Sequence, residues 1–127
     1  MGFFDLFRKK KAPDLNDLWA LWEAGKLPAP YAQLMTYQSE VNNGGHSQYF
    51  FNTANSGDLQ AAVTAVLPLL PEPLRSNLHN GYEAFAAQAD IADDVNDALF
   101  ERCDEVFYAH EQLVNSLLEA YAATLKR

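Results

Sequence analysis

The feature that most constrains the fold is a long repeat of apolar residues near the end of the chain, from about residue 97 to residue 125. Apolar side chains recur there at intervals of three and four, the spacing of one face of an α-helix. They are Leu99, Cys103, Val106, Phe107, Leu113, Val114, Leu117, Leu118, Tyr121 and Leu125. A helix of this length must bury its apolar face, so the sequence predicts a helical domain built around it.

The rest of the chain also favours helices over strands. Helical spacing begins after Pro13 and stops at Gly25, and a second apolar stripe runs from Leu27 to Val41. The segment SQYFFN is a short third helix or an irregular turn. A further helix begins at Ser56 or Asp58 and ends near Pro68, and the next has Pro73 in its first turn and Gly81 weakening its middle. No run alternates as a strand would, which predicts an all-α bundle of five or six helices.

Chain length and composition predict one domain. The chain has 127 residues, of which 49% are hydrophobic, enough for one real core. We expect residues 1–13 to form a flexible tail, apolar and then basic, and residues 14–127 to form a single helical domain. The tail resembles a weak amphipathic anchor, but a solvated terminus is the simpler interpretation. No apolar run approaches the length of a membrane span, and one cysteine permits no internal disulfide. We therefore expect a cytoplasmic protein without stable membrane insertion.

Charge is distributed unevenly along the chain. The formal net charge is −8, and six of the nine basic residues lie near the two ends. Between residues 14 and 125 there are sixteen carboxylates, and the only basic residues are Lys26, Arg75 and Arg102. Nucleic-acid binding requires basic side chains that displace counterions, so this balance argues against direct binding to DNA or RNA.

The acidic residues gather on and before the last helix, opposite its apolar face. They are Asp90, Asp93, Asp94, Asp97, Glu101, Asp104, Glu105 and Glu111, with Glu119 further along. A solvated helix face is the plainest interpretation. However, carboxylates three or four residues apart repel one another, and an ordinary exposed helix interleaves Lys and Arg. A stripe of a single sign can steer a basic partner protein, and we predict these eight residues as a partner-binding surface.

Catalytic and metal-binding motifs are weak. The segment HEQLV begins like the zinc-binding pattern HExxH, but Val114 occupies the second histidine position. His110 lies on the apolar stripe, which favours a histidine in the core. His79 and Glu83 are one helical turn apart, but two ligands do not make a metal site. Neighbouring acids should raise the pKa of the Cys103 thiol, which favours a core residue over a nucleophile. We predict no catalytic group, metal or cofactor.

The segment EVNNGGHSQYFFNTANSGD, residues 40–58, is unusually rich in Asn, Gly and aromatic residues. One interpretation is structural: Asn and Gly end one helix and start the next, and an aromatic group fixes the corner against the core. The other is a small-molecule or hydrolase-like pocket. Its lining would be Asn42, Asn43, His46 and Asn52.

This segment resembles the signature of the DNA-mimic-protein C-terminal-domain family, which is largely a family of unknown function. The matching residues are Glu40, Val41, Asn42, Asn43, Gly44, Gly45, Gln48, Tyr49, Phe50, Phe51, Asn52, Ser56, Gly57 and Asp58. The later segment DEVFY also fits, and the resemblance covers roughly residues 15 to 125. His46 stands where that pattern has a bulky aromatic or aliphatic residue. The resemblance implies an all-α fold and an acidic surface that imitates DNA.

The sequence thus favours a non-enzymatic interaction protein whose acidic surface docks a basic partner protein, such as a DNA-binding regulator. Two alternatives remain open. One is the small-molecule or hydrolase-like site at the Asn-Gly corner. The other is a toxin-neutralising immunity protein, which would use the same acidic docking.

Overall fold

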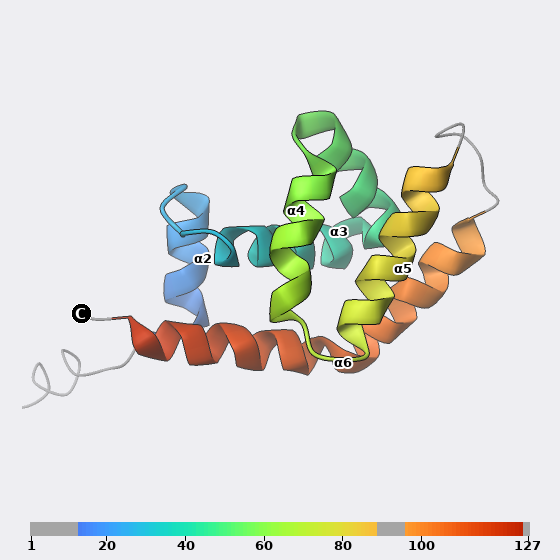
Figure 1. Cartoon of the computed structure of the whole chain (residues 1–127). Helices are drawn as coiled ribbons and strands as arrows, with labels where there is room; N and C mark the ends of the chain where they lie inside the picture. The colour runs from blue at the N-terminus through green and yellow to red at the C-terminus, as the bar shows by residue number, and fades with distance from the viewer. Residues whose placement is uncertain (1–12, 89–95, 126–127) are drawn as a thin grey trace, which may run out of the picture.

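The computed structural model describes residues 13–88 and 96–125, and within them every regular element is helical. The α-helices are α2 (Leu15–Glu23), α3 (Tyr31–Ser56), α4 (Leu59–Val66), α5 (Leu74–Ala87) and α6 (Asp97–Thr124), with a 3₁₀ turn, η1 (Leu67–Leu69). The predicted all-α fold with a long C-terminal helix is confirmed (Figure 1).

Helix α6 is the element to which most of the others attach. Its 28 residues give it a length of about 42 Å. Helix α2 lies near its C-terminal end, α5 runs beside its N-terminal half, and α3 also packs against it (Figure 1). Helix α4 packs against α3 and α5. One hydrophobic cluster joins all five helices, and its largest fully buried side chains include Tyr37, Phe50 and Phe107.

Two helix starts follow from their first residues. Asp14 and Asp17 form a reciprocal capping box at the start of α2, with side-chain to backbone distances of 2.8 and 3.2 Å. Asp58, one of the two predicted caps, accepts a hydrogen bond from the Ala61 amide at 3.0 Å and begins α4. Each cap satisfies a backbone donor that the first helical turn leaves free.

The expected corner at residues 42–45 is a sharp kink within the range of α3, where one helical segment ends and the next begins. Only Gly44 (φ −158°, ψ 16°) and Gly45 (φ 79°, ψ −178°) leave the helical conformation, and the helix resumes at His46. The interpretation of this segment as a corner between two helical segments is therefore confirmed, and SQYFFN belongs to the helical segment that follows the kink. A positive φ carries little steric cost only for glycine, which accounts for Gly45 at the kink.

Three apolar side chains lie elsewhere than the sequence pattern predicted. Leu113, placed on the buried stripe of α6, is 37% exposed, whereas Phe100, which the stripe omitted, is 5% exposed. Phe51 was expected to pack in the core with Tyr49 and Phe50 but is 42% exposed. Consecutive helical residues point about 100° apart, so an aromatic triplet cannot bury all three side chains on one face.

Gly81 allows a close approach between helices. A Cβ at this position would lie 3.2 Å from the Phe50 ring and 3.3 Å from the Cys103 sulfur. The sequence indicated only that Gly81 weakens α5. Its structural role is to let α5 pack closely against α3 and α6.

None of the described helices is long and apolar enough to cross a membrane.

Candidate functional site

A seam of polar contacts, which we call the polar seam, joins one face of α6 to α3. On α6 it comprises Asp104, Tyr108, Glu111 and Asn115, spaced by four, three and four residues. The Tyr108 hydroxyl donates to the Val41 carbonyl at 2.8 Å. The Gln38 amide donates to Glu111 at 3.0 Å and to Asn115 at 2.8 Å. Side chains at this spacing share a helix face, so α6 presents a polar row to α3 beside its apolar stripe.

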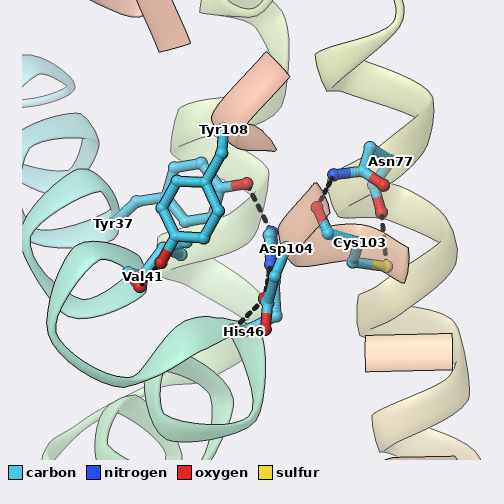
Figure 2. A network of polar contacts seen from close by, with 7 residues as sticks. All are labelled: Tyr37, Val41, His46, Asn77, Cys103, Asp104 and Tyr108. Carbon is cyan, nitrogen blue, oxygen red and sulfur yellow. Dashed lines mark hydrogen bonds and ion pairs between the residues drawn. The ribbon is translucent and has the colours of Figure 1, made fainter. Parts of the chain in front are cut away.

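His46 forms the buried end of the polar seam (Figure 2). Its backbone N–H and its ring Nδ1 both lie 2.7 Å from Asp104 Oδ1. Its Nε2 lies 2.7 Å from the Tyr37 hydroxyl. A carboxylate can only accept, so Nδ1–H donates to Asp104 and Nε2 accepts from Tyr37. The Asp104 carboxylate thereby also caps the second half of α3, where negative charge near helical N–H groups is favourable.

The Asp104–His46–Tyr37 chain resembles a proton relay, but two of its three members are buried in the core. His46 and Tyr37 are both 0% exposed. Burial, followed by weaker effects of neighbouring acidic groups, raises the pKa of Tyr37 well above its usual value. A polar network whose groups are satisfied rigidifies and orients the helices that supply it. We therefore assign these three residues to positioning α3 against α6.

Glu40 holds the two halves of α3 together across the kink. Its Oε2 accepts from the Gln48 amide at 3.0 Å and from the Asn52 amide at 3.0 Å. A Cβ on Gly44 would overlap Gln48 Oε1, so only glycine leaves room for the Gln48 side chain in this position. The spacing Glu-x₃-Gly-x₃-Gln-x₃-Asn in residues 40–52 thus encodes this clamp.

The predicted pocket at the Asn-Gly corner is not assembled from its four residues. His46 is buried in the polar seam, and Asn42 donates to Glu111 at 2.6 Å instead of bonding helix ends. Asn43 is exposed. Only Asn52 borders a cavity, one of about 410 Å³ that also contacts Gly44 and Phe85. These four side chains therefore do not converge on a ligand.

The acidic residues predicted as a partner-binding surface divide into three groups. Asp97, Glu101 and Glu105 are exposed and follow one another at intervals of four on α6; we call them the acidic row. Asp104 and Glu111 were expected on the solvent face of α6. Both instead form hydrogen bonds with α3 and belong to the polar seam. Asp90, Asp93 and Asp94 lie outside the described residues.

The other candidate residues have the surroundings of ordinary core or surface side chains. Cys103 is buried, and burial, with the nearby Asp104 carboxylate, raises the pKa of its thiol. His110 is half-buried, and its Nδ1 lies 3.0 Å from the Val106 carbonyl one turn earlier. His79 and Glu83 lie 3.9 Å apart at the surface. No group of three or more His, Cys, Asp or Glu residues in the described part of the chain could hold a metal ion.

The kinked α3, clamped by Glu40 and joined to α6 by the polar seam, defines an acidic all-α domain whose signature segment builds the kink. Residues 29–125 match the DMP19-like protein family, and the chain belongs to that family. No curated protein and no solved structure matches the chain.

Sequence reasoning missed the inward role of Asp104 and Glu111 and the contribution of Gln38. A signal was present in the spacing, because Asp104, Tyr108, Glu111 and Asn115 fall on a single helix face. Because both side chains are charged, Asp104 and Glu111 were expected to face solvent. The partners of these two acids lie 58 to 73 residues away in the sequence, so helical periodicity could not reveal them.

Proposed function

We propose that this protein is a non-enzymatic acidic interaction protein of the cytoplasm, which docks a basic partner protein, specifically a DNA-binding regulator. The observation that carries the proposal is the acidic row on α6. Its three carboxylates are exposed, while the adjacent acids of the same helix hold the fold together. The family match supports an interaction role of the DNA-mimic kind.

The geometry of the acidic row suits a basic docking surface. Residues four apart on a helix are separated by about 6 Å along its axis, so Asp97, Glu101 and Glu105 present three charges over roughly 12 Å. The polar seam fixes α6 against α3, and the row is therefore held on a rigid support. Aligned charges of one sign raise the rate of encounter with an oppositely charged surface and select against acidic partners.

The test is an affinity capture at two salt concentrations. The full chain, immobilised, is incubated with a lysate of the source cells, and bound proteins are identified by mass spectrometry. We expect a basic DNA-binding protein to be retained at low salt and largely lost near 0.5 M salt, because screening weakens exposed charge pairs. The triple variant Asp97→Lys, Glu101→Lys, Glu105→Lys should lose the same protein at low salt.

A matched control is the reversal of three exposed acids outside α6, Glu23, Glu72 and Glu83. This variant has the same net charge as the first but an intact acidic row, so we expect it to retain the partner. Equal losses from both variants would show that only the net charge matters and would contradict the proposal. Capture of a basic toxin in place of a DNA-binding protein would reassign the protein as an immunity protein.

A further inference from the structure

A cavity lies beside the kink of α3, between that helix and the facing ends of α5 and α6. It encloses about 410 Å³. Its lining includes Gln48 and Asn52 from α3 and Phe85 from α5. A second cavity of about 260 Å³ shares Gly44, Ser47, Asp97 and Phe100 with the first. The two adjoin, and we call them together the kink groove.

The part of the kink groove that α6 lines is acidic. Asp97 and Glu101, two residues of the acidic row, line it together with Asp104. No Lys, Arg or His is among the described residues that line either cavity. A ligand that enters the groove therefore meets up to three carboxylates and no fixed positive charge, which favours a cation.

The lining of the groove also includes aromatic rings and side-chain amides. Phe51, Phe85 and Phe100 line it, and buried Phe50 lies 5.4 Å from the Phe85 ring and 5.7 Å from the Phe100 ring, measured between centroids. Glu40 occupies the amide N–H groups of Gln48 and Asn52. The amide oxygens of these two side chains accept no hydrogen bond from the described residues and remain available to a donor.

We propose that the kink groove receives an arginine side chain of the partner protein. A guanidinium group combines a positive charge, five N–H donors in a planar fork and a flat face that stacks on aromatic rings. The groove offers carboxylates, amide oxygens and phenylalanine rings. A lysine ammonium group would use the carboxylates but could not lie flat on a ring while its donors fork toward several acceptors. Arginine seated in a pocket is also a frequent anchor of protein interfaces.

This inference rests on the proposed function, since it assigns one anchoring contact within the docking surface. The kink groove and the acidic row differ in the chemical group that each requires from the partner. The acidic row needs only positive charge, whereas the kink groove needs a guanidinium group in particular. The two can therefore fail separately.

The experiment titrates the ¹⁵N-labelled full chain with N-acetyl-L-arginine methylamide and follows its amide signals by NMR. We expect saturable shifts of Ser47, Gln48 and Asn52. The lysine analogue should bind about threefold or more weakly, and the citrulline analogue, which has the same shape without the charge, should cause no shift. Asp97→Asn should weaken arginine binding about fivefold, and Ser47→Phe should fill the groove and abolish it. Glu119→Gln, an exposed acid near the far end of α6, should change nothing.

Equal shifts with citrulline, equal affinity for lysine, or shifts that leave the kink groove unaffected would each overturn the inference. Salt-sensitive capture of a basic partner in the presence of any of these results would leave the proposed function standing alone. Specific arginine binding without a captured basic partner would uphold the kink groove and remove the proposed function.

Discussion

The side chain of His46 is fully buried, and its backbone N–H and both ring nitrogens form hydrogen bonds. The ring packs among aromatic side chains as a bulky apolar residue would. Its centroid lies 5.5 Å from that of Tyr37, 5.9 Å from that of Phe50 and 6.1 Å from that of Phe107. Its polar atoms are satisfied by Asp104 and Tyr37. A buried polar group is tolerated under this condition, and loss of one partner leaves a donor unpaired in the core.

Replacing Asp104 with Asn should therefore destabilise the fold. The neutral amide weakens two hydrogen bonds that now end on a charged oxygen, and we expect a loss of about 2 kcal/mol in the free energy of unfolding. Urea denaturation followed by circular dichroism measures it. Glu105→Gln, next in the sequence and exposed, should change stability by less than about 0.5 kcal/mol. Equal stability of the two variants would contradict the capping role of Asp104.

Two buried tyrosines should make the protein sensitive to alkali. Burial raises the pKa values of Tyr37 and Tyr49 above their usual value. Unfolded tyrosines ionise near pH 10, so each group's contribution is complete below that pH. It is lost as pH rises toward the folded-state pKa, by up to about 1.4 kcal/mol per pH unit and tyrosine. Tyr49→Phe should flatten the decline in unfolding free energy between pH 10 and 11, and an unchanged slope would contradict this.

At the scale of the element, the kink of α3 decides where the polar groups of the signature lie. Without it, a straight helix of 26 residues would carry His46 and Asn52 in other directions, and Glu40 could not reach both Gln48 and Asn52. The positive φ of Gly45 brings its backbone close to Asp104. A Cβ at this position would lie 2.5 Å from Asp104 Oδ2. The kink and the polar seam therefore depend on each other.

Three glycine-to-alanine variants separate conformational strain from crowding. Gly45→Ala combines a positive φ with a clash against Asp104 and should cost about 3 kcal/mol. Gly25 has a φ of 70°, and a Cβ added there would meet no heavy atom within 4 Å, so Gly25→Ala should cost only about 1 kcal/mol. Gly57→Ala, with extended φ and open space, should be nearly neutral. Thermal or urea denaturation ranks them, and equal losses at Gly45 and Gly25 would remove the Asp104 contact as a cause.

At the scale of the whole molecule, negative charge is in excess. The described residues carry thirteen carboxylates and three cationic side chains, Lys26, Arg75 and Arg102. Arg75 is used within the fold, since its Nε donates to the Leu67 and Leu70 carbonyls at 3.1 and 3.0 Å. Such a surface attracts basic proteins and opposes the compact state by self-repulsion.

Stability should therefore rise with ionic strength. Between about 10 mM and 200 mM salt, screening shortens the range of repulsion, and we expect a gain of order 1 kcal/mol in the free energy of unfolding. Sodium chloride is the appropriate salt, because sulfate also strengthens apolar burial. The triple Lys variant of the acidic row should be less sensitive to salt than the natural chain. A salt response as large in that variant would show that the row is not a main source of repulsion.

Much of the fold follows from local patterns in the sequence. The spacing of apolar residues predicted α6 and the other helices, and Asp58 was one of two residues expected to cap α4. These features depend on neighbours within one or two turns, which a sequence displays directly. The side chains at Leu113, Phe51 and Phe100 were misplaced because a neighbouring helix, not periodicity, decides which part of a broad face is covered.

The sequence by itself determined the helical class, the excess of negative charge and the signature that marks the family. Only the tertiary structure decided which acids are available. Asp104 and Glu111 bind α3, whereas Asp97, Glu101 and Glu105 face solvent beside the kink groove. The physical reason is distance along the chain: hydrogen-bond partners 58 to 77 residues apart meet only after the helices pack, and that packing separates structural carboxylates from exposed ones.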